Sequence, residues 1–236
     1  MKKLKSLMLL LGLLMSSTVF YSCLDDDPNE YEQIWADSKI AIVTLKPLDD
    51  NSFFMQLNDT TTLYPLNHHA FEVSNETRAL ISYKDSEAQT AGYDYSINIM
   101  RLDTFLTKAI APDLGIENDS YYGTDMLALN GNSIWDPKAI WIEDGYITFD
   151  FVILRGLGNI RHFINLVPVN NADPYELELK HNAYNDEPVV EASSLVSFKL
   201  DNLPSTEGQT VKLKIKYKSY VLNDYRTIEL DYKSKE

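Results

Sequence analysis

Hydrophobic and polar residues alternate with a period of two along much of this chain. The clearest alternation covers residues 211–218, where every second residue is apolar and a lysine stands between each pair. Residues 93–99 alternate in the same way, with Tyr and Ile set against Asp, Ser and Asn. Because successive side chains of a strand point to opposite faces of a sheet, both segments are predicted to be β-strands with one buried face.

Other strands are predicted from shorter or more apolar segments. Residues 146–153 are apolar at most positions, which is typical of a strand at the centre of a sandwich. Residues 155–159 contain two glycines and are expected to form the turn of a hairpin that continues into a strand at 160–167. A short, weak helical pattern covers 104–110. Further strands are expected at 40–45, 52–57, 79–83, 175–180, 195–200 and 227–232.

This pattern predicts an all-β protein with two domains. Residues 111–120 combine Pro112 and Gly115 with polar side chains, which is typical of a joint between domains. We therefore expect one β-domain at 37–110 and a second at 111–236. With 44% hydrophobic residues the composition is that of a globular protein, and domains of this size can bury an apolar core without disulfides.

The first residues have the features of a signal peptide, expected at 1–22. Lysines at positions 2, 3 and 5 precede an apolar run at 7–15, which is far shorter than the roughly 20 residues that cross a bilayer. Cys23 is the single cysteine of the chain and follows directly, so we predict that it carries a lipid. Cleavage directly before Cys23 would place the bulky Phe20 three positions before the cut, where an ordinary signal peptidase needs a small residue. Cleavage by that enzyme after Thr18 is the alternative.

Residues 23–36 are expected to form an acidic tether that begins with Asp25, Asp26 and Asp27. The run LDDDPNE resembles the surface-export signal of Bacteroidota lipoproteins. It implies a location on the outer face of the outer membrane, with the lipid anchor as the membrane contact. A lipidated Cys23 would leave the mature chain without a thiol, which excludes disulfides and thiolate chemistry.

The charge of the chain argues against nucleic acid as a partner. The formal net charge is −14, and loss of a leader with three lysines and no acidic residue would take it to −17. No segment is basic, so sequence-independent binding to nucleic-acid phosphates is not expected.

No pattern in the chain identifies a catalytic or metal site. His68 and His69 are adjacent and would point to opposite faces of a strand, so we predict no metal site and no cofactor. His162 is expected to be a hydrogen-bonded, partly buried histidine. The 35 acidic residues form pairs by chance, and no spacing singles out a glycosidase-like acid and base. We therefore expect a protein that is not an enzyme.

Three segments are candidates for binding. Trp135 and Trp141 lie in a Gly-, Asp- and Pro-containing region at 131–145 and could stack on a ligand. His181, Asn182 and Tyr184 begin a polar segment that is either a binding loop or, as we favour, a hydrogen-bonded corner. The lysines of 211–218 could attract an acidic partner, but acidic residues at 229 and 231 on the next predicted strand favour cross-strand neutralisation.

Several segments together resemble the NigD-like lipoprotein family, and the resemblance spans nearly the whole chain after Cys23. It implies an N-terminal OB-fold barrel at 37–110 and a C-terminal immunoglobulin-like β-sandwich at 111–236, and it supplies no catalytic residues. The segments are SFFMQLNDTTTLYP (52–65), GYDYSINI (92–99), YITFDFVI (146–153), RHFINLV (161–167) and LELKHNAYND (177–186).

We therefore expect a surface-anchored lipoprotein that binds an extracellular peptide, protein or glycan. The family's name derives from a bacteriocin gene cluster, so the resemblance also implies a role in immunity by sequestering a bacteriocin. A glycan hydrolase with an unrecognised carboxylate pair is the third hypothesis.

Overall fold

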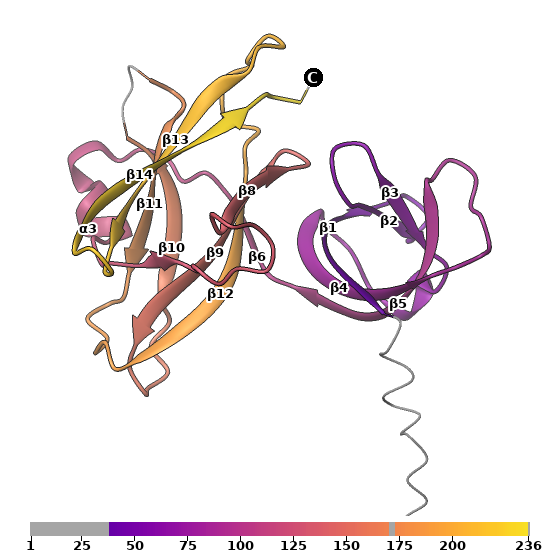
Figure 1. Ribbon diagram of the computed structural model, residues 1–236, viewed down its shortest axis with the longest axis horizontal. Helices are drawn as coiled ribbons and strands as arrows, with labels where there is room; N and C mark the ends of the chain where they lie inside the picture. Colours follow the sequence, from indigo (N-terminus) through magenta and orange to yellow (C-terminus); the bar gives the residue numbers. More distant parts are fainter. Residues whose placement is uncertain (1–37, 170–172, 236) are drawn as a thin grey trace, which may run out of the picture. The chain divides into compact units, whose positions relative to one another are not determined.

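A computed structural model describes residues 38–169 and 173–235 of the chain (Figure 1). Within these residues a closed barrel is followed by a sandwich of two sheets, which confirms the all-β prediction. The expected signal peptide at 1–22 and tether at 23–36, with Cys23 and the acidic residues at 25, 26 and 27, lie outside the described residues.

The barrel is formed by the first five strands, in the order β1-β2-β3-β5-β4. Strand β4 pairs with both β1 and β5, and β3 runs parallel to β5, which closes the sheet. Its interior is filled by alternating apolar residues such as Leu45, Phe53, Met55 and Ile97. The elements are β1 (Lys39–Pro47), β2 (Phe53–Gln56), β3 (Thr62–Pro65), η1 (His68–Ala70), β4 (Thr77–Asp85) and β5 (Tyr95–Thr104).

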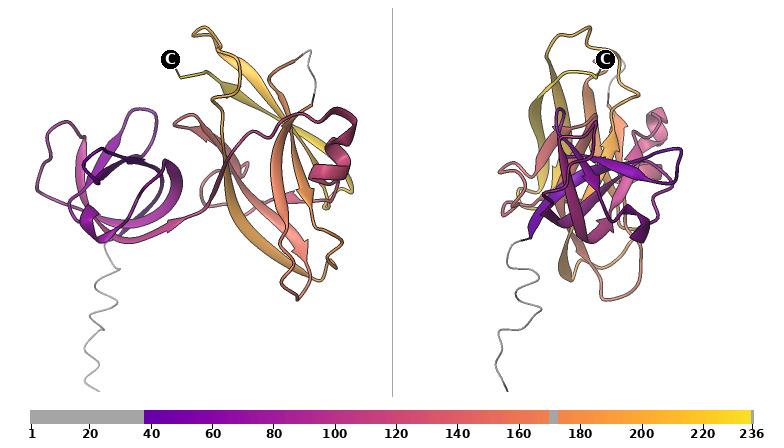
Figure 2. Two further views of the ribbon diagram at one scale, coloured as in Figure 1. Left: turned by 180° about the vertical axis from the view of Figure 1, so that it is seen from behind. Right: turned by 90° about the vertical axis from the view of Figure 1, so that its right-hand side faces the viewer.

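The sandwich consists of a four-stranded sheet, β10-β11-β13-β14, and a five-stranded sheet, β6-β12-β9-β7 with β8 paired to β9 (Figures 1 and 2). Two short helical elements precede β7. The bounds are β6 (Leu106–Ala109), η2 (Gly115–Glu117), α3 (Asn118–Tyr122), β7 (Ala128–Leu129), β8 (Ile140–Glu143), β9 (Tyr146–Arg155), β10 (Phe163–Pro168), β11 (Glu176–Asn182), β12 (Val190–Lys199), β13 (Val211–Ser219) and β14 (Asp224–Tyr232).

Strand β9 is the centre of the five-stranded sheet, as its apolar sequence predicts. It pairs with β12 along its whole length and with β7 and β8 on its other side. Phe149 and Phe151 point into the core that the two sheets share, where Phe149 packs edge-on against Phe198 of β12. On the outward face of the strand Thr148 is buried as well, and its hydroxyl shares a hydrogen bond with Ser197.

The change from barrel to sandwich occurs earlier than the sequence suggests. Residues 106–109, within the weak helical pattern at 104–110, form strand β6, which pairs in parallel with residues 196–199 of β12. The chain therefore passes between the domains at Phe105, not after residue 110. Residues 111–120 are not the expected joint but pack on the sandwich, where the Ala111 amide donates to the Leu166 carbonyl and Asp119 pairs with Lys180.

The hairpin expected around residues 155–159 is also wrong. Strands β9 and β10 belong to different sheets, so this segment crosses from one sheet to the other. Neither glycine here has a positive φ. Gly156 is instead required for a close approach, because a Cβ at this position would lie 2.4 Å from a carboxylate oxygen of Asp186.

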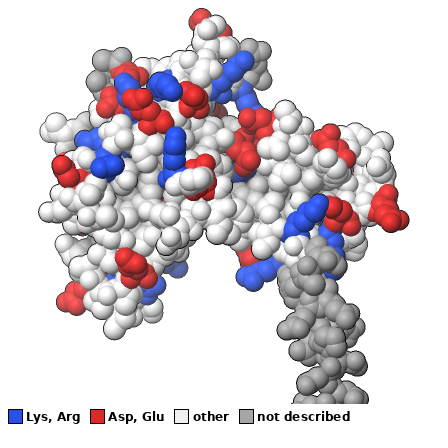
Figure 3. Space-filling model, viewed as in Figure 1, with Lys and Arg blue, Asp and Glu red and all other residues white. Residues whose placement is uncertain are grey.

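Three of the four lysines of β13 pair with acidic side chains, and one of these pairs is the cross-strand neutralisation that the sequence favoured. Lys212 stands opposite Asp231 of β14, and their charged groups are 2.6 Å apart. Lys214 pairs with Asp173, and Lys216 with Glu178 of β11. Figure 3 shows lysines and acidic side chains side by side on the face that carries β13 and β14. These three lysines therefore carry no unpaired positive charge.

An ion pair between a fully buried arginine and a partly buried glutamate connects the barrel to the sandwich. Arg78 of β4 is fully buried, and its guanidinium donates to the Thr44 hydroxyl at 3.0 Å and to the Glu143 carboxylate of β8 at 2.8 Å. Burial raises the pKa of Glu143, and the Arg78 charge opposes that rise. Next to this pair, the Tyr146 hydroxyl donates to Glu76 at 2.5 Å.

Candidate functional site

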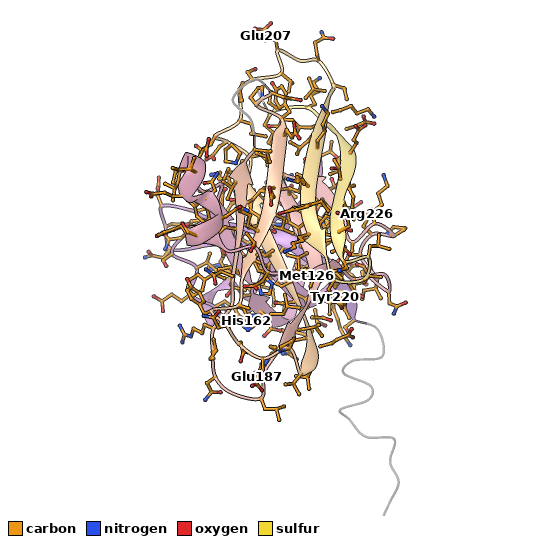
Figure 4. All side chains as sticks on the ribbon, turned by 90° about the vertical axis from the view of Figure 1, so that its left-hand side faces the viewer. Met126, His162, Glu187, Glu207, Tyr220 and Arg226 are labelled. Carbon is orange, nitrogen blue, oxygen red and sulfur yellow. The ribbon has the colours of Figure 1, made fainter. Side chains whose placement is uncertain are left out.

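One end of the sandwich contains an apolar pocket with a volume of about 540 Å³, here called the open-end pocket. It is bounded by β6, the last residues of β9, the first half of β12 and residues 160–164. In Figure 4, His162 lies towards the end of the sandwich marked by Glu187, and Glu207 marks the opposite end.

The pocket forms because the side chains on the inner face of β12 are small at this end of the sandwich. Residues opposite each other in the β9–β12 ladder share a face, and Val196, Ser194 and Ala192 stand opposite Phe149, Phe151 and Ile153. Val196 is fully buried, whereas Ser194 is exposed although it occupies a core-facing position. The core positions of β12 therefore hold too little volume to fill the space between the sheets.

Three positively charged side chains line the pocket: Lys108, Arg155 and Arg161. Lys108 points inward because it stands opposite Phe198, and its ammonium donates to the Ile164 carbonyl at 2.8 Å and to the Asn165 side chain. Burial lowers the pKa of Lys108. Arg155 donates to the carbonyls of Gly156 and Gly158.

None of these three cations has a carboxylate partner. No described acidic side chain forms an ion pair with them, and no Asp or Glu is among the pocket's lining residues. In a chain with a net charge of −14, this concentrates unpaired positive charge around an apolar space.

His162 forms one wall of the pocket and belongs to a chain of hydrogen bonds. Its Nδ1 lies 2.9 Å from Nε2 of His181, and its Nε2 lies 2.9 Å from the Asp186 carboxylate. His181 is buried, and its Nδ1 lies 2.9 Å from the Met126 carbonyl. The Gly156 amide, followed by His162, stabilises the charged form of Asp186 and lowers its pKa. His162 is thus hydrogen-bonded and partly buried, as expected.

The hydrogen-bond partners of His162 and His181 fix two of the ring protons. The Met126 carbonyl can only accept a hydrogen bond, so His181 donates from Nδ1. The Asp186 carboxylate also only accepts, so His162 donates from Nε2. The hydrogen bond between the two rings is made by one further proton, carried by Nδ1 of His162 or by Nε2 of His181.

The segment at 181–186 is a hydrogen-bonded corner, the favoured of the two interpretations. Tyr184 and Asn185 have positive φ angles of 50° and 61°, and the Tyr184 amide donates to the Asn182 side chain at 2.9 Å. Asn182 also donates to the Tyr121 carbonyl. The ring of Tyr184 remains half exposed and packs edge-on against Phe163, which lines the pocket. The corner therefore supports the pocket wall.

The two tryptophans singled out in the sequence are not at this site. Trp141 lies on β8 opposite Thr148, on the face of the sheet away from the shared core, and Trp135 lies in the loop before β8. Neither lines the open-end pocket. Sequence reasoning missed Lys108, Arg155 and Arg161. The signal that could have found the site is the pair of small residues, Ala192 and Ser194, at inward positions of a strand.

The chemistry of the pocket favours binding over catalysis. Ser193 and Ser194 line it with His162, but both ring nitrogens of His162 already have partners, so neither is free to accept a serine proton. The described residues contain no group of three or more His, Cys, Asp or Glu that could hold a metal ion. The cations and the apolar walls instead provide contacts for an anionic, partly apolar ligand.

Comparison with known proteins identifies both domains. Residues 42–104 match the NigD-like N-terminal OB domain, and residues 109–232 match the NigD-like C-terminal beta sandwich domain. No curated protein matches the chain.

Solved structures of the same fold come from Bacteroides and Parabacteroides species. A protein of Parabacteroides distasonis, named as toxin-related, is 33% identical with a TM-score of 0.73; the match covers 84% of this chain and 94% of that one. A NigD-like immunity protein of Bacteroides caccae is 18% identical, with a TM-score of 0.61 and coverage of 84% and 98%. A Bacteroides fragilis protein named as a lipoprotein is 14% identical, with a TM-score of 0.60 and coverage of 84% and 100%. The chain therefore belongs to the NigD-like family, with that family's OB barrel and β-sandwich in sequence order.

Proposed function

We propose that this protein is a non-enzymatic, surface-anchored lipoprotein that binds an extracellular partner in the open-end pocket. The observation that carries the proposal is the coincidence of three cations without carboxylate partners and an apolar pocket of about 540 Å³. Carboxylates of a ligand would form charge-assisted hydrogen bonds with these half-buried or exposed cations, while its apolar part would bury surface in the pocket.

The proposed location at the outer membrane rests on the leader sequence. A lipid on Cys23 would hold the protein at the membrane, and the acidic run after it favours the outer face of the outer membrane. One relative of the same fold is named as a lipoprotein. Among the residues that the structure describes, no helix combines the length and apolar character of a membrane span.

The walls of the pocket favour a peptide or protein over a glycan. Leu106, Ile160 and Phe163 are about half exposed, at 52%, 47% and 48% of their surface, and they line the pocket. A sugar would lose water from its hydroxyls against these side chains without gaining hydrogen bonds. An apolar peptide side chain would bury apolar surface there at no such cost.

Photo-crosslinking on intact cells tests this function with the full, lipidated chain. A photoreactive phenylalanine in place of Ile160, at the pocket, should form an adduct with an extracellular component. The same residue in place of the exposed Val221, in the β13–β14 turn, is the matched control. If position 160 yields no adduct beyond those at position 221, the pocket is not a binding site.

Bacteriocin immunity is a second candidate, favoured by the relative that is named a NigD-like immunity protein. In this role the lipoprotein would sequester a toxin at the envelope. Deletion of the gene should then sensitise the cell to the bacteriocin encoded nearby, and unchanged sensitivity would exclude the role.

A further inference from the structure

We infer that the open-end pocket recognises an extended acidic peptide, which adds as a strand to the edge of β12 and places an apolar side chain in the pocket. This inference rests on the proposed function and names the class of partner. Its three supports are an unpaired strand edge, an apolar pocket beside that edge, and cations that lack carboxylate partners.

The unpaired edge is the first half of β12. Strand β9 pairs with β12 over its whole length, but on the opposite side β6 covers only residues 196–199. Residues 190–195 have no strand on that side among the described residues. Backbone groups along such an edge can pair with an incoming strand, and six residues span about 20 Å.

The pocket lies directly beside this edge. Residues 192–195 of β12 line it, and so does Leu106, the first residue of β6. A peptide that extends the line of β6 along β12 would therefore pass over the opening. Because alternate side chains of a strand point to the same face, every second residue of that peptide could enter the pocket, where Phe151 and Ile164 form the apolar floor.

The charges select an acidic peptide. The nearby acidic side chains are already engaged: Asp186 accepts from His162 and the Gly156 amide, and Glu191 accepts from the Tyr220 hydroxyl. Glu191 also stands opposite Leu154, on the outer face of the sheet. Carboxylates of the peptide would find Lys108, Arg155 and Arg161 without competition and form charge-assisted hydrogen bonds with them.

A peptide fits these features better than a fatty acid. A fatty acid carries an apolar body and a carboxylate, so it could use the pocket and its cations. It has no backbone amides, however, and would leave the edge of β12 unpaired. Only an extended peptide uses all three features at once.

Fluorescence anisotropy on the full-length lipidated protein in detergent micelles tests the inference. The probes are labelled hexapeptides that alternate Glu or Asp with Val or Phe. Matched probes carry Gln and Asn in place of the acids, N-methyl groups on alternate amides, or a C-terminal amide in place of the carboxylate. We expect the acidic probe to bind, and the Gln/Asn and N-methylated probes to bind at least about tenfold more weakly.

Substitutions in the protein locate the contact. Lys108→Met and Arg161→Gln should each weaken binding of the acidic probe at least about tenfold. Lys138→Gln, which removes an exposed cation away from the pocket, should leave it unchanged. Circular dichroism would show whether Lys108→Met remains folded; Arg161 is exposed, so its variant tests the inference even if Lys108→Met does not fold. Binding of the probe with a C-terminal amide would show that side-chain carboxylates, and not the terminal carboxylate, are the recognised groups.

Each other result contradicts the inference in a defined way. Equal binding of the N-methylated probe would exclude strand addition, and equal binding of the Gln/Asn probe would exclude charge recognition. Displacement of the acidic probe by dodecanoate at equal concentration would identify a lipid site instead. If no peptide binds but Ile160 still crosslinks to a partner on cells, the inference fails and the proposed function survives; if both fail, the function falls as well.

Discussion

The imidazole rings of His162 and His181 are joined by a hydrogen bond, with Nδ1 of His162 2.9 Å from Nε2 of His181 and the ring centroids 5.0 Å apart. His162 directly precedes β10, and His181 lies near the end of β11, the antiparallel neighbour of β10. Asp186 and the Met126 carbonyl close the chain at either end. A buried polar chain of this kind is stable only when each donor meets an acceptor.

Nuclear magnetic resonance can detect the protons of this chain directly. We expect ¹⁵N shifts that report a proton on Nδ1 of His181 and on Nε2 of His162. The reason is that the Met126 carbonyl and the Asp186 carboxylate can only accept. An unprotonated Nδ1 of His181 or Nε2 of His162, with the fold intact, would contradict the assignment.

The stability of the protein should fall in mild acid because of His181. Burial, opposed by the Met126 hydrogen bond, lowers the pKa of His181 below 6.5. The unfolded chain therefore binds a proton on this residue more readily than the folded one. The stabilisation is fully present above pH 6.5, and it is lost as the pH falls from 6.5 towards the lowered pKa.

Urea denaturation at pH 7.5 and 5.5 measures this loss. His181→Gln should reduce the difference in unfolding free energy between the two pH values, and His69→Gln, at an exposed position, should leave it unchanged. A titration of His181 in the wild-type protein that gives a pKa of 6.5 or above would show that the premise is wrong.

Gly123 should not tolerate a side chain. Its φ is +85°, and a Cβ would lie 2.3 Å from the His181 carbonyl oxygen and 2.6 Å from Asn182. Gly123→Ala should lower the unfolding free energy by about 2 kcal/mol or more, because it adds strain and a clash in a packed corner. Gly131→Ala meets nothing within 4 Å and should change it by less than about 0.5 kcal/mol. Equal stability of the two variants would mean that the corner is not rigid.

The Arg78–Glu143 pair should couple the barrel to the sandwich energetically. Arg78→Met leaves a partly buried carboxylate without its partner and should cost about 2 to 3 kcal/mol of stability. The double variant with Glu143→Gln should lose less than the sum of the two single losses. As a control, Arg101→Met breaks an exposed pair with Asp103 and should cost less than about 1 kcal/mol. Strict additivity of Arg78→Met and Glu143→Gln would argue against the coupling.

Lipid attachment at Cys23 is open to a direct labelling test. Radiolabelled palmitate should enter the wild-type protein in growing cells and fail to enter the Cys23→Ala variant, since this is the chain's single thiol. Cys23→Ala protein should also leave the membrane fraction. Palmitate incorporation that persists in the variant would remove the membrane address from the proposed function.

The sequence by itself determined most of the long strands and the family. Alternation with a period of two is a local property of a strand, so residues 146–153 and 211–218 could be assigned as strands from their own side chains. The paired charges of Lys212 and Asp231 followed from the same pattern on neighbouring strands. The segments HFINLV and HNAYND marked the NigD-like family, and the family implied the order of the two folds.

Tertiary structure decided which strands are neighbours and what the site is. Gly156 has the sequence context of a hairpin residue, yet it lies where the chain crosses between sheets and makes room for Asp186. Lys108 sits in a segment with a helical pattern, and only the parallel pairing of β6 with β12 turns it into the pocket beside Arg155 and Arg161. These residues are up to 53 positions apart, and contacts between distant segments depend on sheet order, which local alternation does not encode.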